Sequence, residues 1–475
     1  MTETLPAFDP DTRTLVLRPS EPADGAKPAS IVFCGDWAPE GLKGGEPRYG
    51  GLAPILRESD LAVVNVEAVL TDGDIPGACK DGIHLRLPPA ALSGLAEVPF
   101  HVACLANNHI MDFGLAGLER TLRHLSSKGM RVVGAGVQAE RAEQPLACSV
   151  GDTLVGIINA AEGEESRSVD GGPGAASLDI PRISGQIHEV KRQGALAMVV
   201  VHAGREYLPV PAPHIRHAFR ALAAAGADLI VGHHPHVPQG MALVDGTPIA
   251  YSLGNFDLPA PPDAWLQHLG YALKASISRG RVLKVQAIPY RIGTRGPVLL
   301  EGEERRQFGT LLAELSRLAA DQAAADDLWA AYVDRWLEAT GLGELGGSLA
   351  LLGGSRLLVR SALLHTLGLD QRKTGRRPIG GRLGWKLVAA IQPSGVKDGG
   401  PARQAAAVVR NRFDTISHQQ AFLAALQRVM DGRAGTAPAW AHQLLDEWHV
   451  FELDGRQTST GSPRHGRLRT RTTTP

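Results

Sequence analysis

Short apolar runs alternate with helical patterns from residue 30 to about residue 295, and this alternation constrains the fold most. Eight runs have the length and composition of buried strands: Ile31–Cys34, Leu61–Val64, His101–Leu105, Arg131–Val133, Leu154–Ile158, Ala197–Val201, Leu229–Val231 and Ile249–Leu253. Helical periodicity fills several connections, as at Gly114–Lys128 and His214–Ala225. A later pair, Tyr271–Ser278 and Val282–Arg291, has the character of an antiparallel hairpin with Gly280 at its turn. The pattern predicts an α/β sandwich with largely parallel strands.

Changes in amino-acid composition and hydrophobic pattern divide the chain into four parts. Residues 1–28 are rich in Pro, Asp and Thr and are predicted to form a flexible arm, followed by an α/β domain over residues 29–298. Residues 299–453 are predicted to form a mainly helical, basic C-terminal region, in which residues 303–340 carry leucines at helical spacing. Residues 454–475 are polar and are predicted to be disordered.

Charge is balanced over the whole chain but not within it. The 49 Lys and Arg residues equal the 49 Asp and Glu residues, so no overall polyelectrolyte character points to nucleic acid or to a membrane surface. Residues 356–412 are strongly basic and contain only two acidic residues, Asp370 and Asp398. Such a run is either a solvated face or a surface for an anionic or peptide partner.

The N-terminus and the cysteines predict a cytoplasmic protein. The first ten residues have neither the basic nor the apolar segment of a signal peptide. No stretch approaches the roughly 18 apolar residues of a membrane span. None of the four cysteines forms a CxxC pair, and a reducing compartment fits them best: Cys34, Cys79, Cys104 and Cys148.

Six strand ends carry side chains that bind metals or exchange protons. Because ligands of open α/β sheets gather beyond the carboxyl ends of the strands, we expect these residues to meet. They lie in the segments Gly35-Asp36, Asn65-Val66-Glu67, Asn107–Asp112, His202–Tyr207, Gly232-His233-His234-Pro235-His236 and Gly254-Asn255-Phe256. Carboxylates, a carboxamide and imidazoles suit Zn, Mn, Fe or Co better than Ca alone. Glu67 is the natural bridge between two ions about 3.5–4 Å apart.

These motifs resemble the CapA group of capsule or poly-γ-glutamate synthesis proteins, a branch with the calcineurin-like metallophosphoesterase fold. The resemblance covers about residues 30–295 and includes Ala106–Gly114 with Thr121-Leu122, Val133–Gly136 and Tyr251–Phe256 besides the segments above. It implies a four-layer sandwich that holds divalent metal ions, expected to be two. The implied ligands are Asp36, Glu67, Asn108, His202, His234 and His236. His109, next to the ligand Asn108, is implied to be the acid/base group.

One departure from the family pattern changes the expected chemistry. Phosphoesterases of this fold usually carry Asp-x-His after the first strand, whereas this chain has Asp36-Trp37-Ala38. One metal site then lacks an imidazole, and Glu67 replaces the usual aspartate. Plain phosphatase activity is therefore not the expected reaction.

Four polar residues near these motifs keep two interpretations each. His233 is a second-layer or surface residue, or else a ligand, and Asn107 either shapes a turn or belongs to the site. Asp112 either caps the following helix or orients His109. Glu206 either bonds a ligand histidine or acts as a base.

Three functions are compatible with such a centre. The first is hydrolysis of phosphoesters or of polyglutamate-like amides by a metal-activated water. The second is metal-assisted proton transfer at carbon, and the third is non-catalytic binding within a capsule-synthesis complex. Because we expect neither an anchor nor an export signal, a soluble biosynthetic enzyme is favoured. The chain also resembles the soluble enzyme that epimerises the C-terminal residue of a lasso-peptide precursor.

We therefore predict a metal-dependent isomerase that epimerises the Cα of a residue in a ribosomal precursor peptide. The alternative is a CapA-type hydrolase or capsule synthesis protein that acts on amide or phosphoester bonds. Inversion needs a base on one face and an acid on the other, which we assign to His109 and to Glu206 or Asp112. Metal coordination of the substrate carboxylate would stabilise the enolate-like charge. The expected partners are the peptide substrate and a protein that binds its leader.

Overall fold

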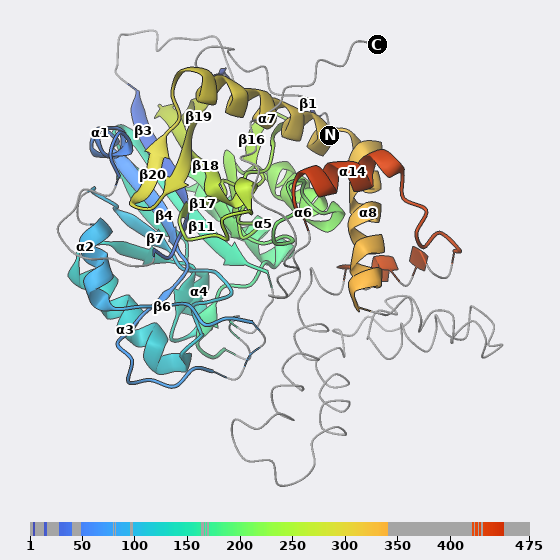
Figure 1. Cartoon of the computed structure of the whole chain (residues 1–475). Helices are drawn as coiled ribbons and strands as arrows, with labels where there is room; N and C mark the ends of the chain where they lie inside the picture. The colour runs from blue at the N-terminus through green and yellow to red at the C-terminus, as the bar shows by residue number, and fades with distance from the viewer. Residues whose placement is uncertain are drawn as a thin grey trace, which may run out of the picture.

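The computed structural model describes residues 28–340 and 420–450 with short gaps, together with Glu3–Thr4 and Thr14–Val16 (Figure 1). The gaps fall at residues 40–48, 79, 81, 96–97, 163–165, 167, 169–170, 422, 426 and 429–430. The basic segment 356–412 and the tail 454–475 lie outside the described residues.

Two large sheets form the centre of the described chain. The seven-stranded sheet has the order β1 (Glu3–Thr4), β15 (Met241–Val244), β16 (Thr247–Ala250), β14 (Leu229–His233), β13 (Leu196–His202), β11 (Thr153–Ala161) and β10 (Leu146–Val150). The nine-stranded sheet has the order β2 (Thr14–Val16), β19 (Arg281–Gly293), β18 (Leu269–Ser278), β3 (Ala29–Trp37), β4 (Leu61–Val66), β7 (Val102–Cys104) and β8 (Arg131–Val133). In the second sheet β17 (Asn255–Asp257) also pairs with β3, and β20 (Gly296–Leu299) pairs with β19. The central strands of each sheet are parallel.

Alternating side chains of the central strands enter two different cores. In β3, Ile31 and Phe33 face the core between the sheets, whereas Val32 and Cys34 face the helices outside the nine-stranded sheet. This period of two is what buried strands require when both faces are covered. The resulting layer order is helix, sheet, sheet, helix, and it confirms the predicted α/β class.

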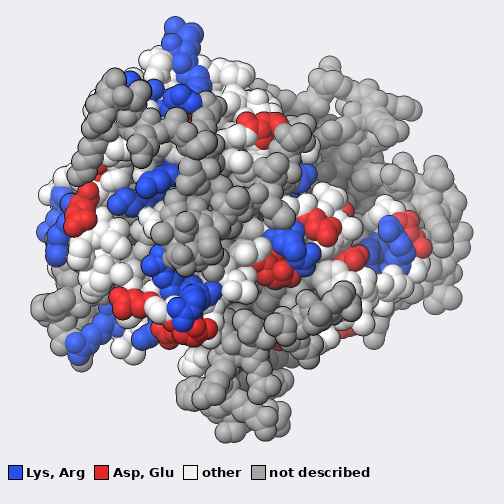
Figure 2. All heavy atoms as spheres, turned by 90° about the horizontal axis from the view of Figure 1, so that it is seen from above, with Lys and Arg blue, Asp and Glu red and all other residues white. Residues whose placement is uncertain are grey.

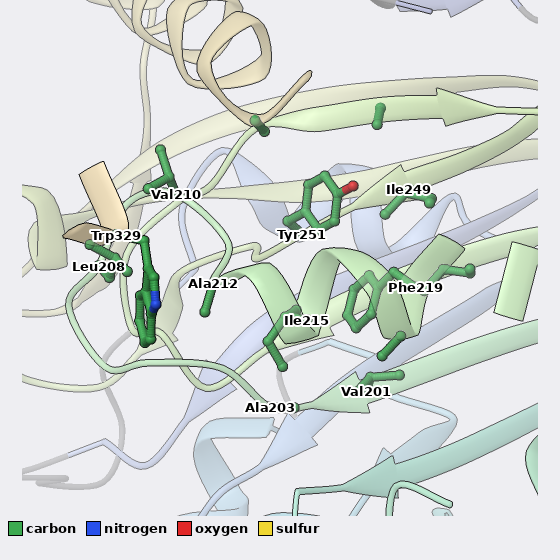
Figure 3. Packing of buried hydrophobic residues seen from close by; sticks show 14 of the residues in the cluster. Val201, Ala203, Leu208, Val210, Ala212, Ile215, Phe219, Ile249, Tyr251 and Trp329 are labelled. Atoms are coloured by element: carbon green, nitrogen blue, oxygen red, sulfur yellow. The ribbon is translucent and has the colours of Figure 1, made fainter. Parts of the chain in front are cut away.

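Helices cover the outer face of each sheet (Figure 1). The nine-stranded sheet is covered by α1 (Leu52–Arg57), α2 (Leu92–Leu95) and α3 (Gly114–Ser127). On the seven-stranded sheet, α5 (Ile180–Arg192) and α6 (Pro213–Ala224) lie on the strands, and α7 (Gly302–Ala320) packs against edge strand β15. Helix α8 (Gln322–Thr340) packs on α6 and α7, and α14 (Ala439–Glu447) packs on α8. Figure 3 shows part of this second core, in which Phe219 and Ile215 of α6 lie beside Val201 of β13.

Smaller elements complete the connections. They are the pairs β5 (Val69–Leu70) with β6 (Arg86–Leu87) and β9 (Ala135–Gly136) with β12 (Gly174–Ala175), the helix α4 (Ala139–Glu143), and the 3₁₀ turns η1 (Pro89–Ala91) and η2 (Trp265–His268). The predicted helical stretch 303–340 forms two helices, because Asp321 is extended between them and its carboxylate accepts a hydrogen bond from the N–H of Ala324 at 3.1 Å.

Exposed charges on the described helices pair locally. On α7, Arg306 contacts Glu303 and Arg317 contacts Glu314, each at i,i+3 spacing. Figure 2 shows acidic and basic side chains lying side by side on the face seen from above. Among the described helices, none is both long and apolar enough to cross a bilayer.

Helix α8 is held from the C-terminal side by two arginine contacts. Arg428 makes a bidentate contact with Asp334, with Nε 2.9 Å from Oδ1 and Nη2 2.7 Å from Oδ2. Arg335 donates to the carbonyls of His442 and Val450, beside α14. The C-terminal helix is therefore part of the same packed body as the sheets.

Near the carboxyl end of β14, the backbone at Gly232 lies very close to the backbone at Tyr251. A Cβ atom at this position would lie 1.9 Å from the carbonyl oxygen of Tyr251, whose backbone is fixed in the sheet core. The N–H of Leu253 donates to the carbonyl of Gly232 at 3.2 Å and keeps the two segments together. Only glycine fits at this position.

Replacing Gly232 by alanine is therefore expected to cost at least about 2 kcal/mol of unfolding free energy, because backbone atoms must move apart. The matched control is Gly185→Ala on the exposed face of α5, where an added Cβ meets nothing within 4 Å. That variant should gain up to about 1 kcal/mol from helix propensity. Urea unfolding of both variants measures the difference, and equal stabilities would contradict the conclusion that only glycine fits at position 232.

The Asp334–Arg428 contact predicts an acid-dependent stability. Burial raises the pKa of Asp334, but hydrogen bonds from Arg428 and from backbone N–H groups outweigh it and hold the pKa below its usual value. A lowered pKa contributes stability that is present above the unfolded-state value of about 3.9 and is lost as pH falls through the folded-state value.

We expect Asp334→Asn to be less stable than the unmodified chain at neutral pH, and the difference to shrink as pH falls below about 4. Urea unfolding over this range measures it. Asp74→Asn is the control, because the Asp74–Arg120 pair is exposed and should contribute less. A difference for Asp334→Asn that stays constant down to about pH 3 would refute the assignment.

Candidate metal centre

The strand ends of the two sheets meet and bring all six predicted ligands together. Each of these side chains is at most 9% exposed: Asp36 in β3, Glu67 after β4, Asn108 after β7, His202 at the end of β13, and His234 and His236 after β14. Parallel pairing fixes this geometry, since β3 runs beside β4 and β13 beside β14. The site therefore joins residues that are up to 200 positions apart in the chain.

One group of donor atoms surrounds His202 Nε2. This nitrogen lies 3.0 Å from Asn108 Oδ1 and 3.0 Å from His234 Nδ1. It also lies 3.4 Å from Glu67 Oε1. Ligand atoms bound to one ion at about 2.0–2.1 Å lie roughly 3.0–3.4 Å from their neighbours. The spacing fits a single divalent transition ion.

Glu67 belongs to two overlapping sets of candidate ligands. Its carboxylate groups with His234 and His236, and also with Asp36 and His202, with the donor atoms of each set within 4.8 Å of one another. His236 Nε2 lies 3.6 Å from Glu67 Oε1, and its Nδ1 lies 3.4 Å from Asp36 Oδ2. This placement suits the bridging role predicted for Glu67.

The charges at the site favour a cation. Burial lowers the pKa of His236, but the negative charges of Glu67 and Asp36 raise it to about 10, so its imidazole is held as a cation. Burial raises the pKa of Asp36, but hydrogen bonds to His233 and His236 hold it well below its usual value. A metal ion would take the place of the imidazolium proton in this negative potential.

Three asparagines hold the ligands in orientation. Asn65 Nδ2 donates to Asp36 Oδ1 at 2.7 Å and lies 3.2 Å from His202 Nδ1. Asn255 Oδ1 lies 2.9 Å from His236 Nδ1, which leaves Nε2 directed at Glu67. Asn107 donates to the carbonyl of Val66 at 2.8 Å. Such outer partners set the tautomer and direction of metal ligands.

His233 and Asn107, which sequence left with two interpretations each, both contact the site. His233 Nδ1 lies 3.0 Å from Asp36 Oδ1, so this side chain supports a ligand from behind. Asn107 Oδ1 accepts a hydrogen bond from the N–H of His109 at 3.1 Å. Asn107 thereby links the turn after β7 to the ligand cluster.

The backbone of the His-Pro-His turn is strained. His234 has φ +96° and His236 has φ +58°, which side chains other than glycine rarely adopt. Each such residue costs about 1–3 kcal/mol and persists only where its surroundings fix it. Here the N–H of Tyr207 donates to the carbonyl of Pro235 at 2.8 Å, and the N–H of His234 donates to Asp36 Oδ2 at 3.3 Å.

A second cluster, made of His109, Asp112 and Lys80, lies beside the ligands. His109 Nδ1 is 2.8 Å from Asp112 Oδ2 and 3.2 Å from Lys80 Nζ, and Lys80 forms an ion pair with Asp112. Burial lowers the pKa of His109 to about 4, so its imidazole is neutral at physiological pH. With Nδ1 directed at Asp112, Nε2 is the nitrogen that remains for proton exchange.

Asp112 orients His109 and does not cap the following helix. The residue before α3 is Phe113, and no side chain caps this helix. Asp112 Oδ2 instead accepts a hydrogen bond from the N–H of Leu85 at 2.7 Å. Burial raises the pKa of Asp112, but the hydrogen bond with His109 and the charge of Lys80 hold it below its usual value.

Glu206 approaches from the segment after β13. Its side chain is partly exposed, unlike the ligands. Burial raises its pKa, but the charges of His234, His236 and Arg205 outweigh this effect and lower the pKa below its usual value, so Glu206 is a carboxylate near the cluster.

Sequence reasoning did not assign Lys80, because no motif surrounds it. Asn65 and Asn255 were signalled only by their position at strand ends.

Metal binding predicts a measurable stabilisation. We expect Mn²⁺ or Zn²⁺ to raise the melting temperature, and EDTA to reverse the shift. Glu67→Gln should weaken metal affinity by at least about 100-fold, because it removes the shared carboxylate charge from the donor set. Calorimetric titration measures this affinity. Glu189→Gln on exposed α5 is the control, and an equal affinity for both variants would exclude Glu67 as a ligand.

Known proteins match the region that carries this centre. Residues 30–258 match the family described as "Bacterial capsule synthesis protein PGA_cap". The PGA biosynthesis protein CapA of Bacillus subtilis (strain 168) is 32% identical over 217 residues, which are 45% of this chain and 57% of that protein. The capsule biosynthesis protein CapA of Bacillus anthracis is 31% identical over 213 residues, which are 43% and 52%. The chain spans about half the length of the curated relatives it matches.

Solved structures align with the chain only weakly. One from Thermus thermophilus has 11% identity and a TM-score of 0.29, over 53% of this chain and 100% of that chain. A similarity of this size carries no argument about the fold, so the calcineurin-like form of the sandwich stays a prediction. The family match and the relatives, in contrast, both support the predicted resemblance to the CapA group: residues 30–258 are similar to the PGA_cap family of bacterial capsule synthesis proteins.

Proposed function

We propose that the chain is a metal-dependent enzyme that hydrolyses amide bonds of an anionic, glutamate-rich polymer during capsule or poly-γ-glutamate synthesis. The observation that carries the proposal is the shared position of Glu67 between two candidate ligand sets, together with the neutral imidazole of His109, the neighbour in sequence of the candidate ligand Asn108. Two divalent ions would be held by these two sets, and Glu67 would be the ligand that they share. The relatives' names supply the polymer.

The chain's own residues suit acid/base work on an amide. Bound divalent ions would polarise the carbonyl and activate water. His109 takes a proton at Nε2 as water attacks and returns it to the leaving nitrogen, while Asp112 holds Nδ1. Lys80 keeps Asp112 ionised, so that the imidazole keeps one orientation throughout the reaction.

The first strand end argues for an amide rather than a phosphoester substrate. Ala38 is buried at the position where phosphoesterases with the calcineurin-like fold, which the sequence resembles, carry a histidine. The carboxylate of Asp36 is instead surrounded by His233, His236 and Asn65. A centre with one imidazole fewer is better suited to polarise a carbonyl than to neutralise a phosphoryl group.

Peptide epimerisation, the function predicted from the sequence, is the second candidate. It is favoured by the separate origins of Glu206 and His109, which come from different sheets, since inversion needs an acid and a base on opposite faces. A peptide substrate, a leader-binding partner protein and a cytoplasmic location belong to this candidate and depend on it.

One experiment separates the two candidates. Metal-loaded protein is incubated in D₂O with poly-γ-glutamate oligomers and, separately, with a candidate precursor peptide, and products are followed by mass spectrometry. Oligomer fragments with new amino groups support hydrolysis. Uptake of one deuterium at Cα without cleavage supports epimerisation and rejects hydrolysis. A third incubation contains a phosphoester, and phosphate release from it with no change in the other two substrates rejects both candidates.

His109→Ala should lower the rate by about 100- to 10,000-fold and leave metal affinity unchanged, because His109 is not a ligand. His188→Ala on exposed α5 is the matched control. Wild-type turnover in His109→Ala would remove His109 from the mechanism. Full activity in EDTA would remove the metal.

A further inference from the structure

Helix α8 lies outside the matched residues 30–258, yet it contacts the segment that carries Glu206. This segment, residues 203–212, connects β13 to α6 and follows the ligand His202 directly. Figure 3 shows Trp329 of α8 beside Leu208 and Val210 of this segment. All three side chains belong to one buried core.

Tyr332 of α8 makes a direct contact with Arg205, the neighbour of Glu206. Arg205 Nε donates to the Tyr332 hydroxyl, and the guanidinium carbon lies 5.6 Å from the centre of the Tyr332 ring. Arg205 is 8% exposed and Tyr332 is 2% exposed. A buried arginine must be partnered, so the hydroxyl and the ring fix the direction in which this side chain leaves the backbone.

Trp329 extends this contact to the other end of the segment. Its ring stacks on Tyr332 at 5.4 Å with 9° between the planes, and His214, the second residue of α6, lies against it at 6.4 Å. His214 Nε2 lies 3.6 Å from Glu162 Oε1. Glu162 in turn accepts a hydrogen bond from the N–H of Gly204 at 2.9 Å. The segment is thus held at both ends.

The opposite side of the segment is hydrogen-bonded to the ligand turn. The N–H of Ala203 donates to the carbonyl of His233 at 3.1 Å, and the N–H of Tyr207 donates to the carbonyl of Pro235 at 2.8 Å. Residues 203–207 therefore lie between α8 and the His-Pro-His turn.

We propose that Tyr332 and Trp329 are positioning residues of the metal centre, and that α8 is one wall of this centre. They hold Arg205 so that Glu206 keeps its place between Arg205 and Tyr207, whose N–H is hydrogen-bonded to Pro235 of the His-Pro-His turn. The contacts described above join the two aromatic side chains to Arg205 and His214, so they act on the geometry of Glu206 and not on metal binding. The expected effect on turnover rests on the proposed function, whereas the expected effect on the order of residues 203–212 does not.

The test uses the full-length, metal-loaded chain and three readouts. Tyr332→Phe removes the hydroxyl and keeps the ring, and Trp329→Leu removes the stacking surface. In Tyr332→Phe, hydrogen–deuterium exchange of residues 203–212 should rise by about tenfold, the size expected for one lost hydrogen bond to a charged group. In Trp329→Leu it should rise as well, because the ring that stacks on Tyr332 and His214 is lost. Exchange of residues 228–236 and the Mn²⁺ affinity should stay within about threefold of wild type, because the ligands keep their contacts. Turnover should show a lowered kcat with KM unchanged.

Arg205→Gln provides a reciprocal test. If Tyr332 acts through Arg205, the double variant Arg205→Gln/Tyr332→Phe should exchange no faster than Arg205→Gln alone. Additive effects would place Tyr332 on a separate path and overturn the proposal.

Arg428→Gln is the matched control for loosening of α8. It breaks the contact with Asp334, two residues beyond Tyr332 and therefore on the far side of the helix. At an equal loss of melting temperature, it should leave exchange of residues 203–212 unchanged.

Exchange that rises equally in the control, or does not rise in Tyr332→Phe and Trp329→Leu, overturns the proposal. So does a joint loss of metal affinity, which indicates general unfolding. If wild type turns over no amide substrate, the proposed hydrolysis fails, while the exchange and metal readouts still decide the role of α8.

Discussion

The burial of two carboxylates, Asp36 and Glu67, at the meeting edge of the two sheets is the constraint on which the rest of the site depends. Both are fully buried, and an isolated buried carboxylate is far too costly to keep. The chain compensates by surrounding them with imidazoles, and His236 is held as a cation by their charge. The same negative potential is what a divalent ion would satisfy, so the electrostatics of the fold and the proposed chemistry have one origin.

The scaffold fixes this cluster with unusual backbone geometry. His234 and His236 have left-handed backbone conformations, and the backbone crosses closely at Gly232. These features raise the free energy of the folded state, and packing between the sheets must outweigh them. These costs are concentrated within five residues of one turn, whereas Asp36, Glu67 and His202 lie at or directly after regular strands. The turn after β14 is therefore the part of the site most sensitive to changes elsewhere in the core.

Periodicity and strand-end position allowed the α/β class, the strands and the meeting of the six strand-end segments to be predicted, whereas the choice of six ligands within these segments came from the resemblance to the CapA group. Arg131–Val133 was predicted with the bounds that β8 has, although this edge strand is only partly buried. The break at Asp321 and the role of Lys80 were not predicted. Each depends on side-chain contacts that no local pattern encodes: a single capping carboxylate in one case, and a loop folded onto residues 109–112 in the other.

The contact of α8 with Arg205 shows that the packing around the site extends beyond the residues that match the family. The family match ends at residue 258, but the packing around Glu206 continues to Tyr332, and α8 is fixed in turn by Arg428 and α14. A buried arginine keeps its orientation only while its partners stay in place, so loss of the Tyr332 contact would disturb the Glu206 side of the site before the ligand side. The two sides thus differ physically: backbone pairing within the sheets holds the ligands, whereas an aromatic contact from a later helix holds the carboxylate beside them.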